Sequence, residues 1–160
     1  MAVDMYMKIG DIKGESRDKV HSGAIDVLAW SWGASNSGSA HMGGGAGSGK
    51  ANFQDISFTK YVDAASSPLL QACAKGTHIP EATLTVRKAG DTPLEYLTIK
   101  MSEVLVSSFS TGGSGGEDRL TENVSLNFAK FIFNYVPQDA KGGKLPAVST
   151  TFDIAQNSAS

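Results

Sequence analysis

Two long apolar-rich segments, residues 94–110 and 120–136, constrain the fold of this chain more than any other feature. Both alternate apolar and polar residues with the period of two that is typical of a β-strand. In each segment, however, the alternation changes parity midway. The apolar residues are Leu97, Ile99 and Met101, then Val104 and Val106, in the first segment, and Leu120, Val124, Leu126 and Phe128, then Phe131, Phe133 and Tyr135, in the second. Such a change indicates a bulge or a bend, which barrels and orthogonal sandwiches use to turn corners.

The rest of the chain supports the same fold class. Alternating or β-rich patterns predict further strands at residues 3–9, 24–33, 52–62 and 82–90. One helix is predicted at residues 66–76, with Ser67 as N-cap, Pro68 in the first helical position and Gly76 as the stop. A length of 160 residues suits one domain with a sizeable core. We therefore predict a single mainly β domain over residues 1–160, an antiparallel β-barrel of two packed sheets with one short flanking helix.

The segment at residues 24–33 places large and small side chains on opposite faces. Large residues occupy its even positions and small ones its odd positions: Leu28, Trp30 and Trp32 against Ala29, Ser31 and Gly33. We predict that the large face is buried, with at least one tryptophan buried against the helix or the opposite strands. The small face then points toward water, a close-packed backbone or an aqueous lumen.

Residues 44–50, GGAGSGK, have the glycine and lysine spacing of a phosphate-binding P-loop. That motif requires a Ser or Thr after the lysine to hold Mg²⁺, and here Ala51 follows. It also requires a strand before it and a helix after it. Polar, glycine-rich residues precede this motif and a strand pattern follows it. We therefore predict a long flexible loop with no nucleotide and no other cofactor.

A second motif, GGSGG, places Gly112, Ser114 and Gly116 in the G-x-S-x-G pattern of a hydrolase nucleophile elbow. The elbow joins a strand to a helix, whereas a strand is expected on both sides here. The histidines also lie outside metal-ligand spacing of one another and of Cys73: they are His21, His41 and His78. We predict no metal site and no enzymatic activity.

Charge and composition exclude further classes. The net charge is −2 and the Lys and Arg residues are scattered, which argues against nucleic acid as a partner. No apolar run is long enough for membrane insertion as a helix. The N-terminal residues lack the charged and apolar regions of a signal peptide. The single cysteine, Cys73, fits folding in a reducing compartment.

Several separated segments, taken in order, resemble one known family: MAVDMYMKIGDIKGES, IDVLAWSWG, HMGGGAGSGK, DISFTKYVD, TVRKAG and EVLVSSFSTGGSGGEDRLTENVSLNFAK. That family is Hcp, the haemolysin-coregulated proteins that form the tube of type VI secretion systems. The resemblance runs from residue 2 to about residue 137. It implies a β-barrel with a flanking helix that assembles into a hexameric ring.

The resemblance also implies partners and a location. Rings of the family stack into a tube inside a contractile sheath and hold effector proteins in their lumen. The implied partners are further copies of the chain, effector proteins, and the spike, sheath and baseplate of the secretion system. The chain would be made in the cytoplasm and secreted through that system without a signal peptide.

Specific residues follow from the strand pattern and the resemblance together. Ser31 is expected to face the lumen and contact effector proteins because it lies on the small face of its strand, and the resemblance places Ser114, in a glycine-rich turn, there as well. The glycine-rich loop is expected to join stacked rings through His41, Met42, Gly43, Gly44, Gly45, Gly47 and Lys50. Two alternatives stay open. One is a monomeric β-barrel that binds a small ligand in its interior, with Ser31 pointing inward. The other is a serine hydrolase that uses Ser114.

Overall fold

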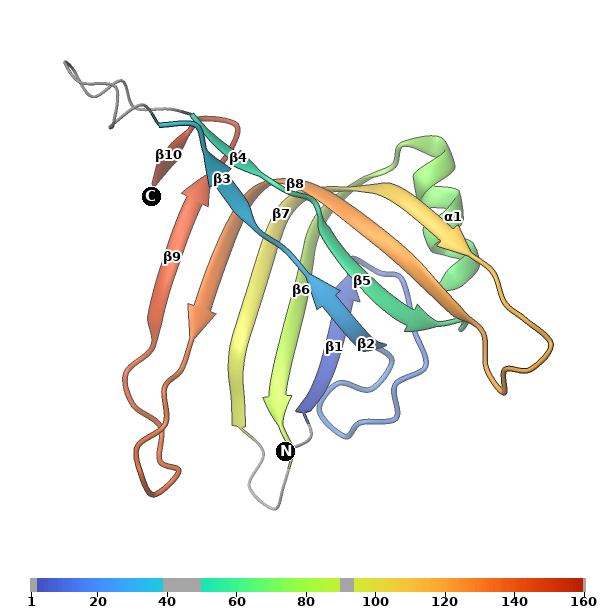
Figure 1. The fold of residues 1–160 in the computed structure, drawn as a ribbon, viewed down its shortest axis with the longest axis horizontal. Helices are drawn as coiled ribbons and strands as arrows, with labels where there is room; N and C mark the ends of the chain where they lie inside the picture. Colours follow the sequence, from blue (N-terminus) through green and yellow to red (C-terminus); the bar gives the residue numbers. More distant parts are fainter. Residues whose placement is uncertain (1–2, 39–49, 90–93, 160) are drawn as a thin grey trace.

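Antiparallel pairing bends one continuous sheet of this chain into a barrel (Figure 1). The computed structural model describes residues 3–38, 50–89 and 94–159. The strands pair in the order β10-β9-β8-β5-β2-β1-β6-β7, and β7 pairs in turn with β8, which closes the barrel. The elements are β1 (Val3–Ile9), β2 (Ile25–Ser31), β3 (Ala34–Asn36), β4 (Ala51–Phe53), β5 (Ile56–Tyr61), α1 (Ser66–Lys75), β6 (His78–Lys88), β7 (Leu94–Thr111), β8 (Thr121–Tyr135), β9 (Val148–Asp153) and β10 (Ser158–Ala159). The predicted mainly β barrel with a short helix is confirmed.

The two long strands, β7 and β8, bend where the sequence predicts. Glu103 has a φ of 57°, a left-handed conformation that is uncommon outside glycine. The flanking pairs are Ser102 with Lys130 and Val104 with Phe128, so the break in β7 lies opposite Ala129, where β8 changes parity. Because the two strands bend at residues that face each other, the pairing register between them is the same on both sides of the bend.

The bend gives one edge of β8 two successive partners. Its first half, Thr121–Leu126, pairs with β5, and its second half, Lys130–Tyr135, pairs with β9. The second half of β8 therefore leaves the closed barrel and carries the hairpin β9–β10 at one side of the molecule (Figure 1). Neither β9 nor β10 was expected, because their sequences lack long alternating apolar patterns.

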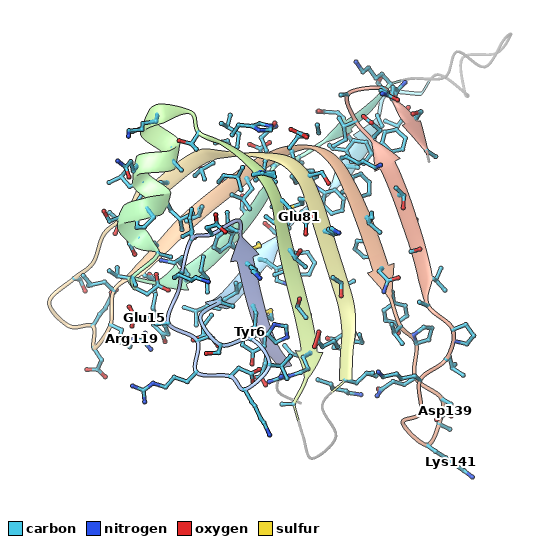
Figure 2. All side chains as sticks on the ribbon, turned by 180° about the vertical axis from the view of Figure 1, so that it is seen from behind. Tyr6, Glu15, Glu81, Arg119, Asp139 and Lys141 are labelled. Carbon is cyan, nitrogen blue, oxygen red and sulfur yellow. The ribbon has the colours of Figure 1, made fainter. Side chains whose placement is uncertain are left out.

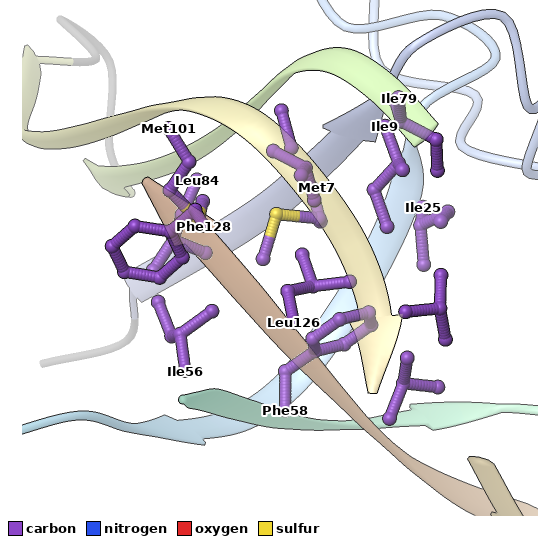
Figure 3. Packing of buried hydrophobic residues seen from close by; sticks show 14 of the residues in the cluster. Met7, Ile9, Ile25, Ile56, Phe58, Ile79, Leu84, Met101, Leu126 and Phe128 are labelled. Carbon is purple, nitrogen blue, oxygen red and sulfur yellow. The ribbon is translucent and has the colours of Figure 1, made fainter. Parts of the chain in front are cut away.

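Inward-facing apolar side chains fill the barrel interior (Figure 3). The most deeply buried come from every strand of the closed barrel: Met7, Ile9, Ile25, Ile56, Phe58, Leu84, Ile99, Met101, Val104, Val124 and Leu126. Each contributes roughly 1.5–3 kcal/mol relative to leaving it in water. The interior is thus a packed core, which contradicts the alternative of a ligand-binding barrel lumen.

The parity prediction for β2 is wrong at Leu28, which is 40% exposed. The register shifts between Val27 and Ala29, so a bulge lies at Leu28. Before the bulge Val27 points inward, and after it Trp30 points toward the core. One extra residue in the strand therefore turns Leu28 outward while the tryptophan keeps its predicted side.

Both tryptophans of the segment pack against the core, but each is only half-buried, so the full burial predicted for at least one of them is wrong. Trp32 lies in a cluster of aromatic rings, which we call the aromatic corner. The cluster fills the space where the partner strand of β8 changes from β5 to β9. Its indole N–H donates a hydrogen bond to the Gln54 carbonyl at 2.8 Å. Its ring contacts four rings of β4 and β8: Phe53, Phe128, Phe131 and Phe133. Phe152 of β9 packs on Phe53 and so extends the cluster. Aromatic packing at the bend therefore supports the change of partner strand.

The helix α1 begins at Ser66, so the prediction of Ser67 as N-cap is wrong. Ala65 occupies the cap position without a side-chain hydrogen bond. The turn before it is held instead by Asp63, whose carboxylate accepts the Ala65 N–H at 2.9 Å. The C-terminal prediction is confirmed, because Gly76 has a φ of 63° and ends the helix. Leu69 and Ala72 pack α1 onto the barrel.

Candidate functional site

Small uncharged residues occupy a continuous part of the outer surface on β2, β5, the first half of β8 and the last part of β7. One row across these strands consists of serines: Ser31, Ser57, Ser125 and Ser108. The adjacent row consists of Ala29, Thr59, Asn123 and Ser110. We call this surface of eight residues the polar wall. Their neighbours along each strand, such as Ile56, Phe58 and Val124, point into the core, so the strand alternation fixes the outward direction of the wall.

Side-chain hydrogen bonds connect β5 and β8 along the polar wall. The Thr59 hydroxyl donates to Asn123 Oδ1 at 2.7 Å. The hydroxyls of Ser57 and Ser125 lie 2.9 Å apart and share a hydrogen bond. These pairs satisfy each other, whereas Ser31, Ser108 and Ser110 are exposed and form no such pair across the strands. In the centre of the wall the side chains of β5 and β8 therefore bond to each other, while the hydroxyl groups of β2 and β7 on either side are available to other partners.

Asp55 lies two residues before Ser57, on the same outward side and at the end of the polar wall. Its Oδ2 accepts a hydrogen bond from the Ser107 hydroxyl at 2.5 Å, and its Oδ1 accepts one from the Asn127 amide at 2.9 Å. The carboxylate is half-buried and both of its donors are neutral. Asp55 thus places one charged group at the end of an otherwise uncharged surface.

A buried charge network lies beneath the polar wall, on the core side of the same two strands. Lys60 is fully buried, and its Nζ donates to Glu122 Oε2 at 2.6 Å, to Asp63 Oδ1 at 2.9 Å and to the Ser66 hydroxyl at 3.1 Å. The Ser66 hydroxyl donates to Glu122 at 2.7 Å. Buried charges are tolerated when they are paired in this way. The network joins β5, β8 and the start of α1.

The opposite side of the barrel is covered by residues 10–24, which we call the strap. The strap crosses β1, and Tyr6 lies beneath it (Figure 2). Its path brings backbone close to backbone: a Cβ at Gly14 would lie 2.5 Å from the Ala24 carbonyl oxygen. Glycine at this position therefore permits the close approach that folds the strap on itself.

A charged cluster around Arg87 ties the strap to the barrel. The guanidinium of Arg87 donates to Asp18 Oδ1 at 2.6 Å and to Asp18 Oδ2 at 3.0 Å. It also donates to the Tyr6 hydroxyl at 2.8 Å and to Asp4 at 3.3 Å. The imidazole of His21 stacks on the Tyr6 ring with centroids 4.6 Å apart. Two strap residues, Asp18 and His21, are thus held against β1 and β6.

The cluster shifts the ionisation of its members. Hydrogen bonds from Arg87 hold the pKa of the Asp18 carboxyl well below its usual range, because they stabilise the charged form. Burial raises the pKa of Tyr6 to about 12, since the phenolate would lose its hydration, and the nearby Arg87 charge opposes this only in part. Hydrogen bonds to Asp18 raise the pKa of Arg87 above its ordinary value. The pair between strap and barrel is therefore charged at neutral pH.

The residues proposed from the sequence lie at three places. Ser31 is exposed on the polar wall. Ser114 is exposed in the connection between β7 and β8, where its carbonyl accepts the Glu117 N–H at 3.2 Å. Lys50 is exposed immediately before β4. The remaining loop residues lie outside the described residues: His41, Met42, Gly43, Gly44, Gly45 and Gly47.

The connection after β7 leads into the strand β8, so Ser114 lacks the following helix that a nucleophile elbow requires. Within residues 3–38, 50–89 and 94–159, both histidines are paired with glutamates: His21 with Glu95 at 3.2 Å, and His78 with Glu103. The same residues contain no cluster of His, Cys, Asp and Glu that could hold a metal ion. No helix in this described part is long and apolar enough to span a bilayer.

Sequence reasoning missed Asp55, the buried charge network and the Arg87 cluster. A signal for the network was present. Lys60 has the parity of the core residue Phe58, and Glu122 has the parity of Val124, so opposite charges occupy inward positions of two strands. The Arg87 cluster left no comparable signal, because 69 residues separate Asp18 from Arg87.

Comparison with known proteins gives consistent matches over most of the chain. A family model described as "Type VI secretion system effector, Hcp" matches residues 6–135. Protein hcp1 of Pseudomonas aeruginosa is 65% identical over 145 residues, which covers 90% of each chain.

Solved structures match equally widely. A structure described as that of a type six secretion system protein has a TM-score of 0.93 at 30% identity and covers 99% of this chain and 100% of that one. Hcp1 from Salmonella typhimurium gives a TM-score of 0.80 at 33% identity over 100% of both chains. A type VI secretion system effector from Yersinia pestis gives 0.77 at 37% identity over 94% of this chain and 99% of that one. Sequence and fold agree, and this chain belongs to the Hcp family of type VI secretion system proteins.

Proposed function

We propose that this chain forms hexameric rings that stack into the tube of a type VI secretion system and hold effector proteins in their lumen. The observation that carries this proposal is the polar wall, an exposed barrel face of small, uncharged side chains. Large or charged side chains would narrow a channel and bind water and ions strongly. Small hydroxyl and amide groups leave a channel wide and offer weak hydrogen bonds to a passing protein surface.

Exposed apolar residues support the assembly of a ring. Five of the ten large apolar residues that are exposed in the described part of the chain form two separate groups: Tyr135, Leu145 and Val148 near β9, and Val62 and Leu120 where β5 ends and β8 begins. A ring requires a heterologous contact, in which one patch of a protomer meets a different patch of the next. Two patches on one protomer meet that requirement, whereas a single patch would favour a two-fold dimer.

The remaining roles follow from family membership. We assign Ser114 to a second contact with the lumen, because its exposed loop adjoins the ends of β7 and β8 that carry the polar wall. We assign the segment from His41 to Lys50 to contacts between stacked rings. We further propose that the protein assembles in the cytoplasm with the sheath, spike and baseplate, and that it leaves the cell through this system without a signal peptide. The chain acts in this proposal as a structural subunit and not as an enzyme.

The test is co-purification of effector proteins with rings of the wild type and of Ser31→Arg. Native mass spectrometry first establishes the number of chains, for which six is expected. An arginine at position 31 should fill part of the lumen with an unpaired charge and reduce effector retention. Ser31 is exposed and pairs only through its backbone, so folding and ring size should not change. Undiminished retention on intact mutant rings would contradict the proposal, and a purely monomeric wild-type protein would contradict the ring.

A further inference from the structure

Asp55 is a carboxylate held in a fixed orientation, and it has no cationic partner within residues 3–38, 50–89 and 94–159. Both of its hydrogen bonds come from neutral donors, the Ser107 hydroxyl and the Asn127 amide. The ion pairs of the described residues use other carboxylates: Asp4, Asp18, Asp63, Glu81, Glu95, Glu103 and Glu122. A carboxylate offers about four lone-pair sites, so its oxygens can accept further hydrogen bonds.

The surroundings of Asp55 strengthen any cation contact that it makes. The side chain is half-buried, so less water competes for it than on a fully exposed surface. The polar wall beside it contains no charged residue that would attract or repel a cation. An arginine or lysine brought to this point would therefore interact with one isolated negative charge whose position is set by Ser107 and Asn127.

We propose that Asp55 is a specificity-determining contact of the polar wall and pairs with an arginine or lysine side chain of an effector protein that lies on it. This inference rests on the proposed function, in which the wall faces effectors. The neutral part of the wall accepts many surfaces with small differences in affinity. A single fixed carboxylate favours an effector that presents a basic group at that point and disfavours one that presents an acidic group.

The experiment uses an effector identified by its loss from Ser31→Arg rings and then purified. Its affinity for wild-type, Asp55→Asn and Asp11→Asn rings is measured at low and high NaCl, about 50 mM and about 1 M, where the Debye length falls from about 14 Å to 3 Å. Asparagine at position 55 keeps a donor and an acceptor for Ser107 and Asn127 but removes the charge. Asp11 is the matched control, an exposed carboxylate on the strap that forms no ion pair among the described residues.

We expect Asp55→Asn to weaken binding about tenfold or more at low salt, as for a charge-assisted hydrogen bond, and to remove most of the salt dependence. Asp11→Asn should behave as wild type. A double-mutant cycle with each basic residue of the effector should then identify one residue coupled to Asp55. Equal affinity and equal salt dependence of wild-type and Asp55→Asn rings would overturn this inference while leaving the role of Ser31 intact.

Two other outcomes are equally decisive. If Asp55→Asn has an unchanged melting temperature but no longer forms rings, Asp55 contacts a neighbouring copy of the chain, and the effector contact is wrong. If Ser31→Arg rings retain every effector, the proposed function itself fails, and the assignment of Asp55 to effector binding fails with it.

Discussion

The polar wall and the strap are outer faces of the same barrel, and they treat polar groups in opposite ways. The wall uses neutral hydroxyl and amide groups in water, with Ser57 and Thr59 bonded to their neighbours on β8. The strap is held by a charged group that is covered and paired, because Asp18 is bound by Arg87. A covered ion pair fixes one chain segment against another. A neutral surface has no charge that selects one partner, which suits a face that different proteins can contact.

The comparison also separates stability from function. Removing one member of a buried charge pair leaves the other without a partner, which lowers the free energy of unfolding. Removing an exposed hydroxyl leaves the remaining group accessible to water, so its cost is small. We therefore expect substitutions at the charged clusters to lower stability, and substitutions on the polar wall to alter binding at nearly constant stability.

The largest effect is expected at Lys60, beneath the wall. Lys60→Met should lower the free energy of unfolding by about 3–5 kcal/mol, because Glu122 and Asp63 lose their cation inside the protein. Chemical denaturation measures this directly. The control is the double variant Lys60→Met with Glu122→Met, which removes both main charges and should recover much of the loss. A single variant as stable as wild type would show that the network contributes nothing to folding.

A smaller loss is expected at the aromatic corner. Trp32→Ala should cost about 3 kcal/mol, because it removes a half-buried ring from contact with Phe131 and Phe133. Thermal unfolding followed by circular dichroism is a suitable measurement. Leu28→Ala serves as the comparison, since Leu28 lies on the same segment but is exposed at the bulge and should cost much less. Equal losses at the two positions would contradict the assigned directions of these side chains.

The cluster beneath the strap predicts that the stability of the fold depends on pH, an effect that the polar wall does not share. The pKa of Tyr6 is raised to about 12 in the folded chain, whereas tyrosine in an unfolded chain ionises near pH 10. The stability that Tyr6 contributes is therefore complete below about pH 10 and is lost as the pH rises toward 12. Tyr6→Phe should be less stable than wild type at pH 7, and the difference should shrink over that alkaline range. A difference that stays constant up to pH 12 would contradict the shift.

The smallest effect on stability is expected within the polar wall. Thr59→Ala should change the free energy of unfolding by about 1 kcal/mol or less, because water can replace the lost hydrogen bond to Asn123. Denaturant titration of the variant alongside Lys60→Met compares adjacent residues that point to opposite sides of β5. A loss from Thr59→Ala as large as that from Lys60→Met would end the distinction between wall and buried network.

The bends of β7 and β8 could be predicted from the sequence, because a change in apolar parity is a local signal. The bulge in β2 carried the same signal, since Ile25 and Val27 share one parity and Trp30 and Trp32 the other. The prediction failed at Leu28 because the segment was treated as one uninterrupted alternation. The rule that located the bends in the long strands therefore also applies to short ones.

The composition of the polar wall could be predicted only in part. The outward direction of Ser31 followed from its small neighbours on one strand. Predicting the serine row would have required the pairing register of β2, β5, β8 and β7. That register pairs residues far apart in the sequence, and bulges shift it. Asp55 could not be placed for the same reason, because its two donors lie 52 and 72 residues away. Long-range register is the information that local patterns do not contain.

The central claim, that the polar wall faces the axis of a ring, is tested most directly by distances between spin labels on assembled rings. The native Cys73 is replaced by alanine, and one label is placed at Ser31→Cys or at Glu81→Cys, which lies on the back of the barrel (Figure 2). Label separations in a symmetric ring grow in proportion to the distance of the site from the axis. We predict shorter separations for position 31 than for position 81. Shorter separations for position 81, or equal ones, would show that the wall does not line the lumen.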